Sequence, residues 1–276
     1  MAQTINTNVM SLNAQRNLNT TQGLMSQSIQ RLSTGLRVNS ARDDSAGLAI
    51  AERMSTQVRG MNVAIRNAND GISLAQTAEG ALGKVGDMAQ RMRELAVQSS
   101  NATNSDDDRL NLDAEYQELA KEITRTLAST SFNGKKILGA DADAMVFQVG
   151  ANTTADDQIT VTTTDLTADA TVTAVTGGAI TDFDTSQTAI DDIDEMIKTI
   201  STQRANYGAT QNRFDSVVAN LQISSENQSA ARGRIMDADF AAETAALTRS
   251  QVLQQAGTAM LSQANAAPQN VLSLLR

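Results

Sequence analysis

Two clusters of carboxylates are the groups in this sequence that are most able to bind a metal ion. Three consecutive aspartates form residues 106–108, and a second acidic group spans residues 191–195. Closely spaced carboxylates can bind Ca²⁺ or Mg²⁺ through their oxygens, but neither cluster has the glycine and glutamate that complete an EF-hand loop. We expect a helix to begin at each cluster, where the helix dipole favours acidic side chains. Helix stabilisation therefore explains both clusters, and we predict no metal site.

Histidine and cysteine are absent from the sequence. Their absence removes Ser-His-Asp and Cys-His nucleophiles, His/Cys zinc sites and disulfides, and leaves only carboxylate, Lys or Ser/Thr chemistry. The net charge of -9 at pH 7 argues against nucleic-acid binding. No apolar run is long enough to predict a membrane helix, and the start of the chain lacks the basic and apolar regions of a cleaved signal. We therefore predict no enzyme, no cofactor and no membrane or nucleic-acid partner.

Charge is distributed unevenly along the chain. Residues 1–42 contain four arginines and no acid, and residues 244–276 contain two arginines and no acid. Residues 140–200 contain twelve acidic residues and one base, Lys198. This pattern predicts that the two ends are buried and that the middle is solvated.

Apolar side chains repeat every three or four residues from residue 51, as in a coiled-coil seam. The repeat predicts a helix from about Asp44 to Ser99. It loosens at Gly80, Gly83 and Gly86 and then resumes. The seam consists of Ala51, Met54, Val58, Met61, Ile65, Ala68, Ile72, Ala75, Met88, Met92 and Leu95. Its methionines are expected to fill the core rather than bind a ligand.

A second helix is predicted to begin after Ser105, a good N-cap residue. Asn133-Gly134 predicts a two-residue hairpin turn, and the Thr-rich segment from there to about Asp184 predicts a small β region. A clear 3-4 repeat then returns and predicts a third helix, which pairs with the helix 44–99 as a hairpin whose tip is the β region. The seam of this third helix consists of Ile190, Ile193, Ile197, Ile200, Arg204, Tyr207, Gln211, Phe214, Val218 and Leu221.

Weaker helical repeats lie near both ends of the chain. Such helices have too little apolar surface to be stable alone, so we expect them to be disordered in the monomer and ordered by packing in an assembly. The residues that would pack there are Leu18, Met25, Ile29, Leu32 and Leu36, together with Leu253, Met260, Ala267, Val271 and Leu274.

Three segments resemble the terminal signatures of bacterial flagellin: MAQTINTNVMSLNAQRNL, QRLSTGLRVNSARDDSAGLAIAERM and QVLQQAGTAMLSQANAAPQNVLSLLR. The resemblance covers about residues 1–140 and 187–276. It implies a mainly α fold, a long helical hairpin and coiled-coil bundle with a small β region in the middle of the chain. The inner domain, D0, would comprise residues 1–43 and 235–276. The next domain, D1, would comprise 44–140 and 187–234, with a short β-containing variable region at 141–186 in place of large outer domains.

The same resemblance implies a function and a set of partners. Flagellin is the filament subunit of the bacterial flagellum, and it is secreted without a cleaved signal through the flagellar type III apparatus. Its partners would be further copies of itself, the filament cap, hook-junction proteins, an export chaperone and the export gate. A hook-filament junction protein is the nearest alternative, and a cytoplasmic coiled-coil scaffold is a more distant one.

The segment at residues 90–98 has the pattern of a solvated helix face when it is considered alone. Its likeness to flagellin implies instead a surface that is recognised by the flagellin-sensing Toll-like receptor and also used as a filament contact. The residues carried over are Arg91, Leu95, Gln98 and Glu115. By the same likeness, cytosolic inflammasome receptors would recognise the tail residues Val271, Leu272, Leu274 and Leu275.

Overall fold

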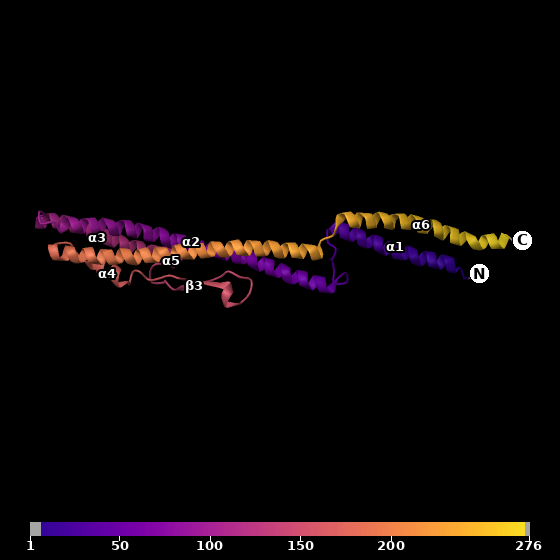
Figure 1. The fold of residues 1–276 in the computed structure, drawn as a ribbon, viewed down its shortest axis with the longest axis horizontal. Coiled ribbons are helices and arrows are strands. Elements are labelled where there is room, and N and C mark those ends of the chain that lie inside the picture. Colours follow the sequence, from indigo (N-terminus) through magenta and orange to yellow (C-terminus); the bar gives the residue numbers. More distant parts are fainter. Residues whose placement is uncertain (1–6, 274–276) are drawn as a thin grey trace. The chain divides into compact units, whose positions relative to one another are not determined.

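The computed structural model describes the backbone of residues 7–273 and the side chains of residues 7–266. The described elements are α1 (Val9–Thr34), α2 (Ser45–Ser99), α3 (Asp106–Ser129), β1 (Ser131–Phe132), β2 (Lys135–Lys136), β3 (Ala144–Gln148), η1 (Ala155–Asp157), β4 (Gln158–Thr162), α4 (Ala170–Gly177), α5 (Phe183–Met236) and α6 (Phe240–Ser273) (Figure 1). The predicted class, mainly α with a small β region in mid-chain, is confirmed.

The described chain divides into two compact units. One unit takes residues up to 56 together with those from 227 onward, and the other takes residues 57–226. The first unit is built around α1 and α6, and the second holds α3, α4, both β hairpins and the greater part of α2 and α5.

An antiparallel pairing of α2 with α5 forms the spine of the second unit. Arg93 on α2 bonds Asp194 on α5 at 2.6 Å, and Arg204 on α5 lies 3.3 Å from Glu79 on α2. The two helices bury part of each predicted seam along their length, whereas Ile65, Ile72 and Ile197 of the predicted seams are only partly buried. The buried hydrophobic residues include Ala64, Ala68, Ala75, Ala78, Leu82, Val85, Ala89 and Met92 on α2, and Ala189, Ile193, Met196, Ile200, Tyr207 and Phe214 on α5.

The seam of α2 does not loosen at its glycines, contrary to the sequence prediction. Leu82 and Val85 are fully buried between them and continue the repeat. Gly80 is exposed, whereas Gly83 and Gly86 are only partly buried. The glycines thus lie off the seam, where they do not interrupt its packing.

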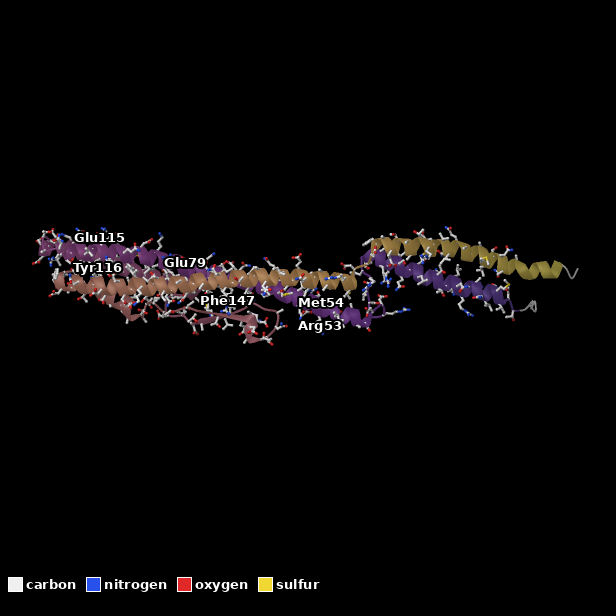
Figure 2. The ribbon with its side chains drawn as sticks, viewed as in Figure 1. Arg53, Met54, Glu79, Glu115, Tyr116 and Phe147 are labelled. Atoms are coloured by element: carbon white, nitrogen blue, oxygen red, sulfur yellow. The ribbon has the colours of Figure 1, made fainter. Side chains whose placement is uncertain are left out.

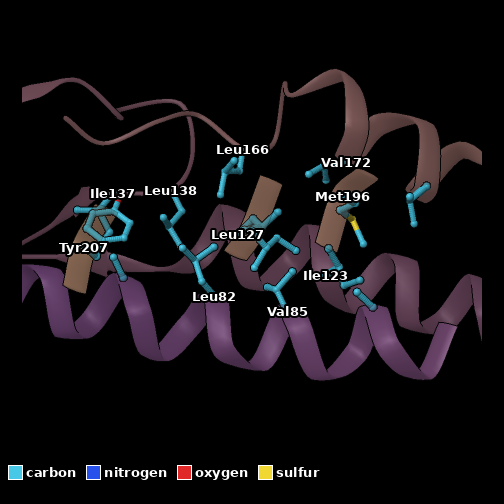
Figure 3. Packing of buried hydrophobic residues seen from close by; sticks show 14 of the residues in the cluster. Leu82, Val85, Ile123, Leu127, Ile137, Leu138, Leu166, Val172, Met196 and Tyr207 are labelled. Atoms are coloured by element: carbon cyan, nitrogen blue, oxygen red, sulfur yellow. The ribbon is translucent and has the colours of Figure 1, made fainter. Parts of the chain in front are cut away.

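Helix α3 and the chain that follows it complete this core (Figure 3). Its buried residues Ile123 and Leu127 lie in the same cluster as Leu82 of α2 and Leu138 and Leu166 of the connecting segments. Ser105 caps α3 as predicted: its hydroxyl accepts from the Asp108 N–H at 3.2 Å, and the Asp108 carboxylate accepts from the Ser105 N–H at 3.1 Å. This capping box satisfies two N–H groups that a helix start leaves unpaired.

The second acidic cluster does not lie at a helix start, so that expectation is wrong. Helix α5 begins at Phe183, where the Asp182 carboxylate accepts from the Thr185 N–H at 2.8 Å. The residues 191–195 therefore lie inside the helix. Asp194 pairs with Arg93, and Glu195 lies 3.3 Å from Lys198. Ion pairing, and not the helix dipole, accounts for these two acids.

The first β hairpin follows the predicted turn. Asn133 has a φ of 49° and Gly134 a φ of 82°, and antiparallel β1 and β2 flank them. Two successive residues of positive φ are the signature of a type I′ turn, which Asn-Gly favours.

The remaining β region differs from the prediction in two respects. Residues 170–177 form helix α4, because Asp169 caps its first turn at 2.9 Å and Val172 and Val175 are buried, which outweighs their strand propensity. The hairpin of β3 and β4 does not form a tip. It packs beside the long helices, with the Phe147 ring 5.6 Å from that of Phe214 on α5.

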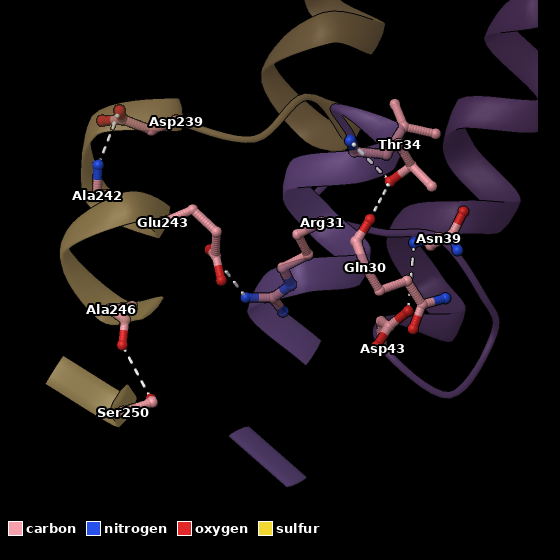
Figure 4. Close-up of polar contacts among 11 residues, drawn as sticks. Gln30, Arg31, Thr34, Asn39, Asp43, Asp239, Ala242, Glu243, Ala246 and Ser250 are labelled. Atoms are coloured by element: carbon pink, nitrogen blue, oxygen red, sulfur yellow. Dashed lines mark hydrogen bonds and ion pairs between the residues drawn. The ribbon is translucent and has the colours of Figure 1, made fainter. Parts of the chain in front are cut away.

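In the first unit, α1 and α6 run antiparallel (Figure 4). The Arg31 guanidinium of α1 lies 3.6 Å from the Glu243 carboxylate of α6. At the other end of the pair, the Asn8 amide donates to the Ala264 carbonyl at 2.7 Å. Both terminal helices are confirmed, and their disorder in the isolated chain stays a prediction.

Candidate functional site and assembly surfaces

The contact between α1 and α6 is made through small side chains. Ser11 and Ser28 of α1 are buried, as are Ser250 and Ala264 of α6. A β-carbon on Gly257 would stand 2.9 Å from Cδ1 of Leu18, so glycine permits the close approach at this level. Small side chains bury less apolar area than leucine or isoleucine would at the same positions, so each contributes less to the stability of the helix pair.

The predicted packing residues of α1 and α6 do not all lie at this contact. Leu18, Met25, Leu32 and Leu36 are partly buried, whereas Ile29 is exposed. On α6, Leu253 is 49% exposed and Met260 is 63% exposed. The heptad that faces α1 is instead the small-residue set Ser250, Gly257 and Ala264. Ala267, Val271 and Leu272 lie outside the described side chains, and Leu274 and Leu275 lie outside the described residues altogether.

Further exposed apolar residues lie on the same two helices, outside the helical repeats predicted from the sequence. They are Val9, Met10, Leu12 and Leu24 on α1, and Phe240 and Val252 on α6. The sequence could have indicated them through the near absence of charge on both helices. Helix α1 carries only Arg16 and Arg31, and helix α6 carries only Glu243 and Arg249. Apolar surface with so little charge is typical of an interface with another chain.

A second candidate surface lies where α2 meets α3 in the other unit. The Arg91 guanidinium bonds the Glu115 carboxylate at 2.9 Å and the Glu94 carboxylate at 3.0 Å, with both partners about half exposed or more. Glu115 is labelled in Figure 2. These two carboxylates, Glu94 first, raise the pKa of Arg91. Gln98 is exposed about two turns beyond Arg91 along α2. Glu94 was not carried over with this set, although its spacing of three residues from Arg91 on a helix could have indicated it.

Leu95 does not belong to this exposed surface, which corrects the role implied by the resemblance and confirms its predicted place in the seam of α2. Its side chain is 1% exposed and lies in the hydrophobic core. The reason is the register of α2: Met92 and Ala96 belong to the buried seam, and Leu95 shares their side of the helix. Arg91, Gln98 and Glu115 remain available at the surface.

Within the described residues, no three acidic side chains come together in a way that could hold a metal ion. No described helix has the length and hydropathy needed to span a membrane.

Comparison with known proteins assigns both halves of the chain. The model of the bacterial flagellin N-terminal helical region matches residues 5–142, and that of the bacterial flagellin C-terminal helical region matches residues 190–275. The chain belongs to the flagellin family. This family is structural and not enzymatic, and its N- and C-terminal regions here contain α1–α3 and most of α5 with α6.

Several flagellins are similar to this chain over its whole length. It is 48% identical over 272 residues to a flagellin of Halalkalibacterium halodurans and 41% identical over 304 residues to a flagellin of Bacillus subtilis, with 99% of each chain covered. It is also 41% identical over 286 residues to the flagellar filament 33 kDa core protein of Treponema phagedenis, again with 99% of both chains covered.

Solved structures agree with this assignment. The crystal structure of Bacillus cereus flagellin matches with a TM-score of 0.50 and 32% identity, covering 60% of this chain and 94% of that one. A putative flagellar hook-associated protein from Vibrio parahaemolyticus matches with a TM-score of 0.59, covering 71% of this chain and 100% of that one. Its identity of 13% makes it evidence for the fold alone.

Proposed function

We propose that this chain is a filament subunit that polymerises into the bacterial flagellar filament. Membership of the flagellin family supports the proposal, and the observation that carries it is the apolar, nearly uncharged surface of α1 and α6. Leu253 and Met260 are exposed in the single chain, so another copy of the chain is the natural partner for them. Burial of that surface between subunits would stabilise both helices.

The residues proposed to make contacts between subunits on α1 and α6 are those predicted from the sequence together with the further apolar residues that are exposed there. Contacts between different patches of neighbouring copies, repeated without closing into a ring, generate an open helical polymer. D0 and D1, with the boundaries predicted above, would be the inner and outer layers of that polymer. Seeded assembly of the purified chain, followed by sedimentation and electron microscopy, tests the proposal: filaments are expected, and a chain that stays monomeric at every concentration contradicts it.

The finer parts of the function follow from the family resemblance and from exposure. Passage through the flagellar type III apparatus would require an unfolded chain, which the small side chains of the α1·α6 contact favour. The cap, the hook-junction proteins, the chaperone and the export gate would act along that route. The Arg91, Gln98 and Glu115 surface would be recognised by the flagellin-sensing Toll-like receptor, and the last residues by cytosolic inflammasome receptors.

A hook-filament junction protein would share this fold. The identity of 48% to a flagellin across 99% of both chains favours the filament subunit. The relative abundance of the chain in sheared flagella separates the two roles, because a filament subunit dominates that fraction and a junction protein is a minor component of it.

A further inference from the structure

Helix α2 presents a row of three exposed residues with a basic residue at each end. Arg59, Val63 and Arg66 follow one another at intervals of four and three residues, so they lie on one face of the helix. Val63 is 44% exposed. Among the ion pairs of the described residues, neither Arg59 nor Arg66 takes part, whereas Arg91 and Arg93 of the same helix are both paired. We call Arg59, Val63 and Arg66 the basic row.

Helix α3 carries a row of the same spacing and the opposite charge. Asp106, Leu110 and Asp113 also follow at intervals of four and three residues, and the exposed Asp107 stands beside Asp106. Leu110 is 56% exposed. Asp113 is partly buried, and its carboxylate accepts from the Ile180 N–H at 2.8 Å. Asp106 and Asp107 take part in none of the described ion pairs. We call these four residues the acidic row.

The two rows match in geometry as well as in charge. In each row the outer residues are seven positions apart, or about 10 Å along a helix, with one apolar residue between them. Laid face to face, the rows would place a carboxylate beside an arginine and Leu110 against Val63. Charge complementarity of this kind selects the partner and the register of a contact.

Within one chain the two rows cannot meet. Glu115 of α3 bonds Arg91, which lies about 40 Å beyond Val63 along α2 at the helical rise per residue. Leu110 lies still further away, because α3 runs back from the end of α2 and Leu110 precedes Glu115. The partner of each row must therefore come from another molecule.

We propose that the basic row of one copy docks on the acidic row of a second copy, as a head-to-tail contact between subunits. The contact joins two different patches, so each copy keeps one of each free and addition can continue without limit. This inference rests on the proposed function, since it names a contact within the polymer.

Cysteine cross-linking tests the contact directly, because the natural sequence contains no cysteine. The variant Val63→Cys/Leu110→Cys should give a ladder of disulfide-linked oligomers when its filaments are oxidised, and monomers when the dispersed chain is oxidised. A disulfide within one chain is excluded by the separation of the two positions. The matched control is Val146→Cys/Leu110→Cys, since Val146 is 58% exposed, more than Val63, but lies on β3.

The outcomes separate this inference from the proposed function. A wild-type chain that forms no filaments overturns the proposed function. Filaments in which Val63→Cys/Leu110→Cys cross-links no more than the control overturn the docking contact and leave the filament role intact.

Charge reversal supplies a second test of the same contact. Arg59→Glu/Arg66→Glu alone and Asp106→Lys/Asp107→Lys alone should each raise the critical concentration for assembly tenfold or more. The four changes combined should lower it again by at least threefold, a partial recovery because Asp113 stays acidic opposite an introduced glutamate. Arg213→Glu is the control, because Arg213 is exposed on α5 and unpaired among the described residues. Circular dichroism verifies that each monomer keeps its helices. Reversals without effect, or folded fourfold variants without recovery, contradict the contact.

Discussion

The ring of Phe214 occupies the place where a side chain at residue 71 would begin. A β-carbon on Gly71 would stand 2.6 Å from Cζ of Phe214, and glycine is therefore required where α2 and α5 cross at this level. Phe147 of β3 meets the same ring edge-on at an interplanar angle of 81°. The Phe214 ring thus packs against both α2 and the β3–β4 hairpin.

Gly71→Ala should destabilise the second unit by about 1–3 kcal/mol, as expected for overpacking of a core. Gly80→Ala is the control on the same helix: its β-carbon would meet nothing within 4 Å, and it should stabilise the helix by about 0.5–1 kcal/mol. Urea unfolding of the monomer measures both. Equal effects of the two changes would show that the Phe214 contact is not rigid.

The two tyrosines form a second matched pair. The Tyr116 hydroxyl donates to the Val175 carbonyl at 3.0 Å, whereas the Tyr207 hydroxyl is buried without a hydrogen-bond partner among the described residues. Tyr116→Phe should therefore cost about 0.5–1.5 kcal/mol of unfolding free energy, and Tyr207→Phe should be neutral or stabilising. A larger loss for Tyr207→Phe than for Tyr116→Phe in urea unfolding would contradict this assignment.

The same burial predicts an alkaline limit to stability. Burial raises the pKa of Tyr207 from 10.0 to about 12, and it also raises the pKa of Tyr116. For a raised pKa, the stabilisation is complete below the unfolded value and is lost as the pH rises from about 10 through the folded value. Tyrosinate absorbance should therefore stay low at pH 11 in the folded chain and rise together with loss of helix. Ionisation near pH 10 with full helical content would refute the prediction.

Substitutions at the α2–α3 surface should separate recognition from folding. Arg91→Ala should weaken activation of the flagellin-sensing Toll-like receptor and cost at most about 1 kcal/mol of stability, because exposed ion pairs contribute little. Leu95→Ala should cost about 2–5 kcal/mol as a core truncation. Leu95→Lys should weaken both receptor activation and assembly by disrupting the core. Receptor activation assays alongside thermal unfolding test this distinction, and a folded, fully active Arg91→Ala variant would remove Arg91 from the surface.

Much of the fold follows from local patterns in the sequence. The N-cap at Ser105 and the Asn133-Gly134 turn each depend on residues close together in the chain, and each was predictable. The helical repeats of α2 and α5 were predictable too, but the structure buries only some of the residues that the repeats predicted. The start of α5 also has a local signal, because Asp182 lies three residues before Thr185, the spacing of a helix cap. The acidic residues 191–195 predicted a later start.

The features that were missed depend on contacts between distant segments. Helix α4 forms where Thr and Val favour a strand, because its valines are buried against the rest of the unit. The exposure of Leu253 follows from which face of α6 meets its neighbour. Periodicity defines the faces of a helix, but only the neighbouring helix decides which face is covered.

Removal of residues 253–276 tests whether α1 and α6 are required for filament assembly. The second unit holds its own core and lacks any of these residues, so the truncated monomer should keep its α2, α3 and α5 helices by circular dichroism. It should fail to form filaments in seeded assembly, where the full chain polymerises. A truncated chain that forms normal filaments would contradict the claim that α1 and α6 carry the assembly.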